Sequence, residues 1–129
     1  MPKKESFIIN RLKSIAYAVN GACILIRTEA SLQVQIVIGF IVTFAGYYYA
    51  ISPTEWLIQI GVIGIVIALE GLNTAIEKLA DFVHPHQHKE IGVIKDIAAG
   101  AVFLFAIIAI IMGLIIYIPK VFKIHFGLG

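Results

Sequence analysis

The sequence predicts an all-α integral membrane protein, with an N-terminal amphipathic surface helix followed by three transmembrane helices. Two properties of the whole chain lead to this class. Of its 129 residues, 60% are hydrophobic, and its mean hydropathy is +0.94, whereas soluble domains are about half apolar. So short a soluble chain would have too little polar surface to cover this content, and a bilayer removes that need. We therefore expect residues 1–129 to form one membrane-embedded domain.

The charge pattern argues against a nucleic-acid partner. The formal net charge is only +2, and the basic residues are spread thinly between apolar runs instead of forming a stripe. A nucleic-acid backbone requires a basic patch or stripe. The lone Cys23 offers no internal disulfide and is interpreted as a small apolar packing residue.

The segment 5–27 is predicted to be the amphipathic surface helix. Its apolar side chains recur at helical spacing, and Lys4, Arg11 and Lys13 can form a polar side. The apolar set is Phe7, Ile8, Leu12, Ile15, Val19, Ala22 and Ile26. This pattern is typical of a helix lying at the boundary between headgroups and acyl chains.

Three apolar runs, 32–51, 56–80 and 97–118, are predicted to cross the membrane. About 20 apolar residues cross a hydrocarbon core of roughly 30 Å. Between the first two runs, Ser52, Pro53 and Glu55 suit an N-cap, the first helical position and the third. This predicts a tight turn between antiparallel helices. We expect a loop from His84 to Glu90 before the third span, and Pro119 to end that span.

The distribution of lysine and arginine predicts a multi-pass protein of a bacterial cytoplasmic membrane with a cytoplasmic N-terminus. The basic residues on the predicted cytoplasmic side are Lys3, Lys4, Arg11, Lys13, Arg27, Lys78, Lys89 and Lys95. The turn at 52–55 has none. Lys120 and Lys123 fall on the other side, against the rule, but they are fewer and come last.

Acidic residues within the second span are the most informative feature. An aspartate in mid-span costs about 2.5–3.5 kcal/mol on insertion scales, so such residues are seldom kept without a partner or a task. Glu70, Asn73 and Glu77 have the spacing i, i+3, i+7 and share one helical face, which Asp81 extends. Glu70 lies deepest and is best placed to meet a hydroxyl of a membrane lipid.

Together with Glu29 and the pair Lys95-Asp96, this face predicts an acidic site with one cation at the cytoplasmic interface. A few hard oxygen ligands suit Mg²⁺ with substrate phosphates, and hence phosphoryl transfer. The structural alternative is that the acidic residues face water or pair with Lys78 and Lys95 as anchors. That alternative is favoured for Asp81 and Lys78, and the functional one for Glu70.

Two segments carry a family resemblance. The run EGLNTAIEKLAD from Glu70 to Asp81, followed by IKDIAAGA from Ile94 to Ala101, resembles the signature of the prokaryotic diacylglycerol kinase family, which includes undecaprenol kinases. The resemblance spans nearly the whole chain. It implies an ATP-dependent lipid kinase that is a homotrimer with sites between subunits.

The resemblance also implies roles for individual residues. Glu70 would be the general base, Asn73 would orient groups in the site, and Glu29 and Glu77 would hold Mg²⁺ with ATP. The residues that would contact the nucleotide are Tyr17, His88, Lys95 and Asp96.

The alternating histidines His84, His86 and His88 allow two interpretations. They could form a metal-binding tract, because alternate side chains can converge in an extended loop. No cysteine or carboxylate stands at matching spacing, which favours a solvated loop in which His86 or His88 covers the adenine.

The acceptor lipid has two candidates. The first is diacylglycerol, which would give phosphatidic acid. The second is undecaprenol, because Thr74 and the run 97–100 look closer to the Gram-positive branch associated with that lipid. Gln33-Val34-Gln35 also replaces the Arg-Gln-Glu of the best-known diacylglycerol kinases, so we expect lipid contacts there to differ.

Two other classes of function are weighed against the kinase. A small proton-coupled transporter would use Glu70 as its carrier carboxylate, but transporters of this size usually need four helices per chain. A non-catalytic membrane subunit would leave unexplained why Glu29, Glu70, Asn73, Glu77 and Asp96 gather at one depth.

Overall fold

The computed structural model of the chain describes residues 4 and 6–127, which contain four α-helices joined by short connections. These are α1 (Phe7–Thr28), α2 (Ala30–Tyr48), α3 (Pro53–Val83) and α4 (Lys89–Phe126). The predicted all-helical class is confirmed. Residue 5, where the surface helix was expected to begin, and Lys3 of the basic set lie outside the described residues.

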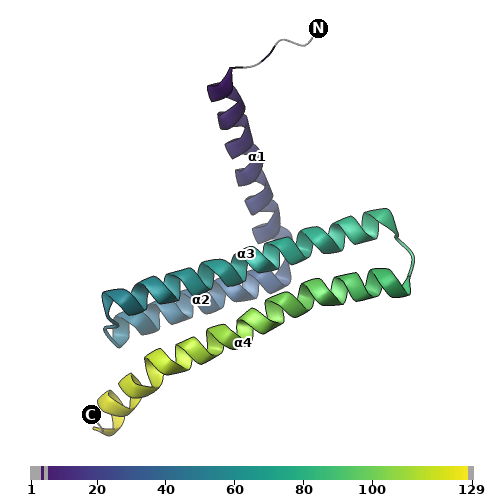
Figure 1. Cartoon of the computed structure of the whole chain (residues 1–129). Helices are drawn as coiled ribbons and strands as arrows, with labels where there is room; N and C mark the ends of the chain where they lie inside the picture. Colours follow the sequence, from purple (N-terminus) through teal and green to yellow (C-terminus); the bar gives the residue numbers. More distant parts are fainter. Residues whose placement is uncertain (1–3, 5, 128–129) are drawn as a thin grey trace.

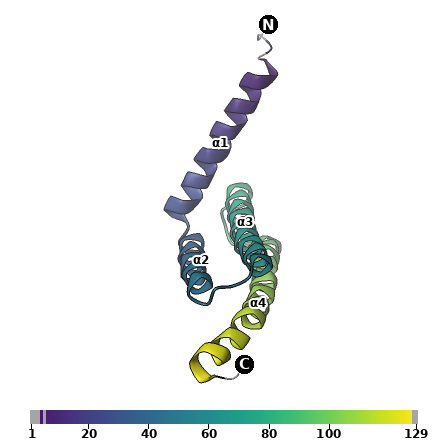
Figure 2. The ribbon, with the colours of Figure 1, turned by 90° about the vertical axis from the view of Figure 1, so that its left-hand side faces the viewer.

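Helix α3 packs against both α2 and α4, and the three run side by side as a bundle (Figure 1). All three are long and apolar enough to cross a membrane, as the three apolar runs predicted. Helix α1 contacts α2 at its C-terminal end and points away from the bundle (Figure 2). Its apolar residues are largely exposed. Its placement on a membrane surface stays a prediction.

The turn between α2 and α3 is held by a reciprocal capping box, as the sequence predicted. The Glu55 backbone N–H donates to Ser52 Oγ (3.2 Å), and the Ser52 backbone N–H donates to Glu55 Oε1 (2.9 Å). The close approach of α2 and α3 here requires glycine at position 46, because a Cβ there would lie 2.6 Å from Trp56 Cη2. The first span ends at Tyr48 instead of residue 51, and the chain leaves the helix through Ala50, whose φ is 52°.

The prediction that Pro119 ends the last helix is wrong, since α4 continues to Phe126. A proline inside a helix loses one backbone hydrogen bond and strains the preceding turn. Contacts beyond Pro119 compensate: Lys120 Nζ lies 2.8 Å from Glu55 Oε2, and Tyr49 Oη lies 3.1 Å from His125 Nε2. Both tie the end of α4 to the α2–α3 turn.

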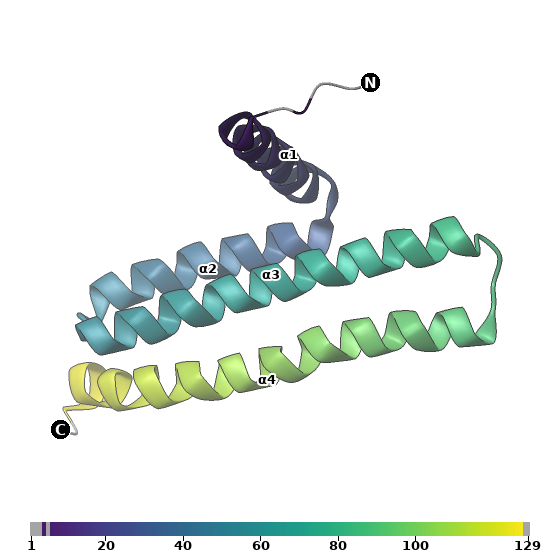
Figure 3. The ribbon, with the colours of Figure 1, turned by 45° about the horizontal axis from the view of Figure 1, so that its top comes forward.

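Helices α3 and α4 extend beyond the predicted spans 56–80 and 97–118. With 31 and 38 residues, they are about 46 Å and 57 Å long at 1.5 Å per residue, longer than a hydrocarbon core of about 30 Å. They meet at a loop of five residues, 84–88, where His88 caps α4 by accepting from the Glu90 backbone N–H at 3.1 Å. Both helices extend beyond the α1–α2 junction toward this loop (Figure 3).

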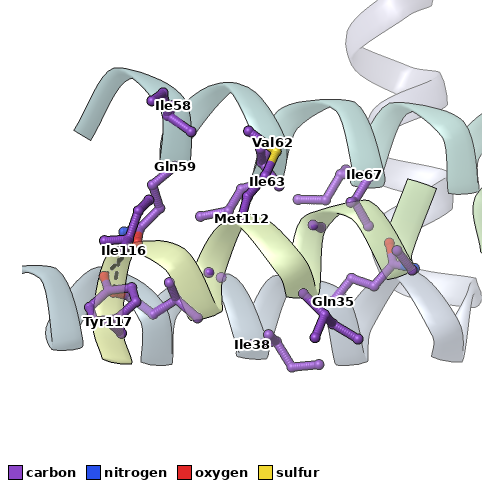
Figure 4. A pocket seen from close by; sticks show the side chains of 17 residues that line it. Gln35, Ile38, Ile58, Gln59, Val62, Ile63, Ile67, Met112, Ile116 and Tyr117 are labelled. Carbon is purple, nitrogen blue, oxygen red and sulfur yellow. Dashed lines mark hydrogen bonds between the residues drawn. The ribbon is translucent and has the colours of Figure 1, made fainter. Parts of the chain in front are cut away.

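An apolar groove of about 450 Å³ lies where α2, α3 and α4 meet (Figure 4). A buried polar cluster closes one end. There Tyr117 Oη donates to Gln59 Oε1 (2.5 Å), and Gln59 Nε2 donates to the Val42 carbonyl (3.2 Å). Gln35 lies at the other end of the groove in Figure 4. The groove thus runs along the bundle from this cluster toward the acidic residues of α3.

Candidate active site

A cavity of about 360 Å³ collects Glu29, Glu70 and Glu77, three of the acidic residues that the sequence singled out. Its walls come from the α1–α2 junction, from α3 and from α4. The lining residues are Glu29, Ser31, Glu70, Asn73, Thr74, Glu77, Ala99, Val102 and Phe103. The predicted face of α3 and the predicted entrance residue of the first span therefore meet in one place.

The deeper residues on the α3 wall of the cavity are buried. Acidic residues that served only as anchors facing water would be exposed. Glu70 is 9% exposed and Asn73 is 7% exposed. The Asn73 amide Nδ2 donates to Glu77 Oε1 at 3.3 Å. The other amide atom, Asn73 Oδ1, is buried and has no hydrogen-bond partner among the described residues. A buried acceptor without a partner is costly, so this atom is suited to receive a donor or cation from a ligand.

Glu29 reaches the cavity from the junction between α1 and α2. Its extended backbone (φ −101°, ψ 106°) ends one helix and starts the next. Its N–H donates to the Leu25 carbonyl (3.0 Å), and its own carbonyl accepts from the Gln33 N–H (3.0 Å). The Gln33 side chain also donates to the Ile26 carbonyl (2.9 Å). The backbone of this junction is therefore fixed by hydrogen bonds on both sides.

Glu70 has one described hydrogen-bond partner, which sequence reasoning missed. Gln35 Nε2 of α2 donates to Glu70 Oε2 at 3.3 Å. From its sequence position, Gln35 was expected only to alter the contacts with lipid. The available clue was its position as a polar residue within an otherwise apolar span. Burying a polar side chain in a membrane costs free energy, so Gln35, like Glu70, is expected to have a partner or a task.

Five other predicted residues do not line the cavity within one chain. Lys95 Nζ lies 2.6 Å from Asp81 Oδ1, a pairing that the anchor interpretation of Asp81 expected. Tyr17 on α1 is 74% exposed. The three remaining predicted residues, on α4 or in the loop before it, are also exposed: Asp96, His86 and His88. Their contacts with a nucleotide stay predictions.

The cavity offers two carboxylates for a cation instead of a complete metal cage. In the described part of the chain, no three His, Cys, Asp or Glu side chains are grouped closely enough to hold a metal ion by themselves. Mg²⁺ is commonly bound by one or two carboxylates, with substrate phosphates and water completing its shell. Glu29 and Glu77, which line the same cavity, fit that pattern. Lys78 Nζ, on a largely exposed side chain, lies 3.6 Å from Glu29 Oε1.

Comparisons with known proteins match most of the length of this chain. Residues 16–117 match the family described as prokaryotic diacylglycerol kinase. An undecaprenol kinase of Bacillus subtilis (strain 168) is 39% identical over 113 residues, covering 87% of this chain and 92% of that protein. A diacylglycerol kinase of Synechocystis is 30% identical over 116 residues, covering 89% of this chain and 66% of that protein. A diacylglycerol kinase of Haemophilus influenzae is 24% identical over 115 residues, covering 88% of this chain and 98% of that protein.

Proposed function

Because this chain belongs to the prokaryotic diacylglycerol kinase family and is therefore an ATP-dependent lipid kinase of the membrane, we propose that the cavity is its active site. There the γ-phosphoryl group of ATP is transferred to the hydroxyl of a membrane lipid. The observation that carries this proposal is the convergence of Glu29, Glu70, Asn73 and Glu77 on one cavity, where Asn73 Oδ1 has no hydrogen-bond partner in the described part of the chain. Phosphoryl transfer needs such positioning and charge neutralisation more than covalent chemistry.

Glu70 is the proposed general base. It is the deepest of the three residues on the α3 face, so it is the carboxylate nearest to where a membrane-anchored hydroxyl would lie. In the transfer, the lipid O–H bond breaks and its proton goes to Glu70. The lipid oxygen bonds to the γ-phosphorus, and the bond from that phosphorus to the β–γ bridging oxygen breaks. ADP leaves with the electron pair of that bond.

Glu29 and Glu77 are the proposed Mg²⁺ ligands. Their carboxylate oxygens are the hard ligands that Mg²⁺ prefers, and the Asn73 amide is bonded to Glu77. When bound, the ion would neutralise charge on the β- and γ-phosphates. Asn73 would orient Glu77 through Nδ2 and would offer Oδ1 to a donor on the substrate side.

The nucleotide contacts are proposed to be completed by a second copy of the chain in a homotrimer. A neighbouring subunit could receive these contacts because the proposed nucleotide-contacting residues do not line the cavity of their own chain: Tyr17, His86, His88, Lys95 and Asp96. Lys95 would have to exchange its ion pair with Asp81 for the nucleotide. The distribution of basic residues supports a cytoplasmic N-terminus in a bacterial cytoplasmic membrane. The cavity would then open toward the compartment that holds ATP.

Two acceptor lipids remain candidates. Diacylglycerol, giving phosphatidic acid, is the acceptor in the family's description. Undecaprenol, giving undecaprenyl phosphate, is supported by the relative that is 39% identical and is named for that activity. A proton-coupled transporter, the alternative from another class, has no observation in its favour now that the chain matches a kinase family over residues 16–117.

The test is a transfer assay with the purified chain in lipid vesicles. ATP labelled at the γ-phosphate and Mg²⁺ are supplied with diacylglycerol, with undecaprenol, or with neither lipid. Label should appear in one or both lipids, and should be lost in the Glu70→Gln variant, which keeps the size of the side chain but removes the base. If neither lipid is labelled by the wild-type chain, the proposed function is wrong.

A further inference from the structure

Gln35 occupies the point where the apolar groove meets the catalytic cavity. Its side chain lines the groove, and its Nε2 donates to Glu70 Oε2, a residue that lines the cavity. Its remaining amide atom, Oε1, is buried and has no partner among the described residues. If Gln35 served only to join α2 to α3, its unpaired buried acceptor would be a cost without a function.

The chemistry of the two groups fixes which amide atom faces Glu70. An ionised carboxylate only accepts hydrogen bonds, so the amide N–H must face it. Once Glu70 has taken a proton, it becomes a donor, and a half-turn of the amide about its last torsion would offer Oε1 to that proton. Glutamine, which carries a donor and an acceptor on one planar group, can therefore pair with both protonation states of Glu70.

On the basis of the proposed function, we propose that Gln35 is a positioning residue for the general base. It aims the Glu70 carboxylate at the lipid hydroxyl through the hydrogen bond from Nε2–H, and after the phosphoryl group has moved its Oε1 accepts a hydrogen bond from protonated Glu70. The transferred proton stays on Glu70 until it is released to water. Gln35 itself touches neither ATP nor the reacting phosphorus.

The same molecule provides a matched control. Gln59 also joins α3 to α2 through an amide, since its Nε2 donates to the Val42 carbonyl at 3.2 Å. It lies at the opposite end of the groove and does not line the cavity. Replacing either glutamine by methionine keeps the side chain's length and removes its hydrogen bonds. The two variants then differ in whether Glu70 loses its partner.

The experiment measures kcat, the KM for ATP and thermal unfolding for Gln35→Met, Gln59→Met, Glu70→Gln and the double variant Gln35→Met/Glu70→Gln. Gln35→Met should lower kcat by roughly 10- to 100-fold, because a misaimed group can cost up to about 10²-fold. Its KM for ATP should stay within about twofold. Gln59→Met should lower the unfolding temperature with kcat retained. In the Glu70→Gln background, Gln35→Met should cost less than about twofold more, because residues that act as a unit are not additive.

Two results would overturn the inference while leaving the kinase in place. One is a kcat for Gln35→Met that falls no further than that of Gln59→Met. The other is a double variant whose loss equals the product of the two single losses, since Gln35 would then act independently of Glu70. A wild-type chain that labels neither lipid would instead refute the proposed function itself, which separates the two failures.

Discussion

Replacing Asn73 by alanine should reduce catalysis sharply and leave the fold nearly as stable. The side chain is 7% exposed and makes one described hydrogen bond, from Nδ2 to Glu77 Oε1 at 3.3 Å. Its Oδ1 atom is buried, and no described residue pairs with it. The alanine variant therefore removes one bond to a carboxylate and one unpaired acceptor together.

The magnitudes follow from these two terms. A hydrogen bond to a charged group contributes about 1.5–3 kcal/mol, and an unsatisfied buried polar atom costs about 1–3 kcal/mol. For the folded state these nearly cancel. Because the side chain borders an open cavity of about 360 Å³, its loss creates no closed void, and we expect the free energy of unfolding to change by less than about 1 kcal/mol. In catalysis only the loss counts, which corresponds to roughly a 10- to 150-fold lower kcat/KM.

The assay pairs turnover with unfolding, and Ile51→Ala serves as the control. Ile51 is 6% exposed and lies in the α2–α3 turn, at the other end of the bundle from the cavity. Removing its side chain should cost about 2–5 kcal/mol of stability but keep the activity per folded molecule. If Asn73→Ala unfolds as readily as Ile51→Ala, or keeps wild-type turnover, the role assigned to Asn73 is wrong.

Three further outcomes are expected. Glu77→Gln should weaken nucleotide binding measured by calorimetry with Mg²⁺ present. Glu70→Gln should leave that binding nearly unchanged while kcat falls by roughly 10²-fold or more. If both variants weaken binding equally, Glu70 is a metal or nucleotide ligand. Mixed oligomers of Glu70→Gln and Glu77→Gln chains should recover activity that neither has alone, and no recovery in well-mixed oligomers would place each site within one chain. Gly46→Ala should destabilise the fold by about 1–3 kcal/mol because its Cβ would meet Trp56, whereas Gly64→Ala, which meets nothing within 4 Å, should not; equal unfolding temperatures would refute this.

The sequence predicted the fold correctly where the structure depends on interactions between residues that are close in the chain. Ser52, Pro53 and Glu55 form the capping box that their order indicated, because a cap depends only on neighbours in the chain. Pro119 was misjudged as a helix end for the opposite reason. Its local cost is offset by the ion pair of Lys120 with Glu55, 65 residues away, and such a partner is not visible in the local pattern.

The same distinction applies to the site. Glu70, Asn73 and Glu77 were found because helical spacing alone puts them on one face. The pairing of Gln35 with Glu70 was missed, because it depends on the register of α2 against α3, which apolar spans of this kind leave open. Tyr17 and His88 lie outside the cavity of their own chain. Their predicted contacts with a nucleotide depend on how subunits pack together, so these contacts stay predictions.

Glu29 takes part in the backbone hydrogen bonds of both α1 and α2, and this limits where residues can be inserted or tags attached. Its N–H belongs to the hydrogen-bond ladder of α1 and its carbonyl to that of α2, with no spacer residue between them. One residue inserted there would turn the following helix by about 100° relative to the preceding one, carrying the carboxylate away from Glu77 or Gln35 away from Glu70. Extensions and tags are therefore expected to be tolerated before Phe7, because α1 points away from the bundle there (Figure 2), and to abolish activity between Thr28 and Ala30.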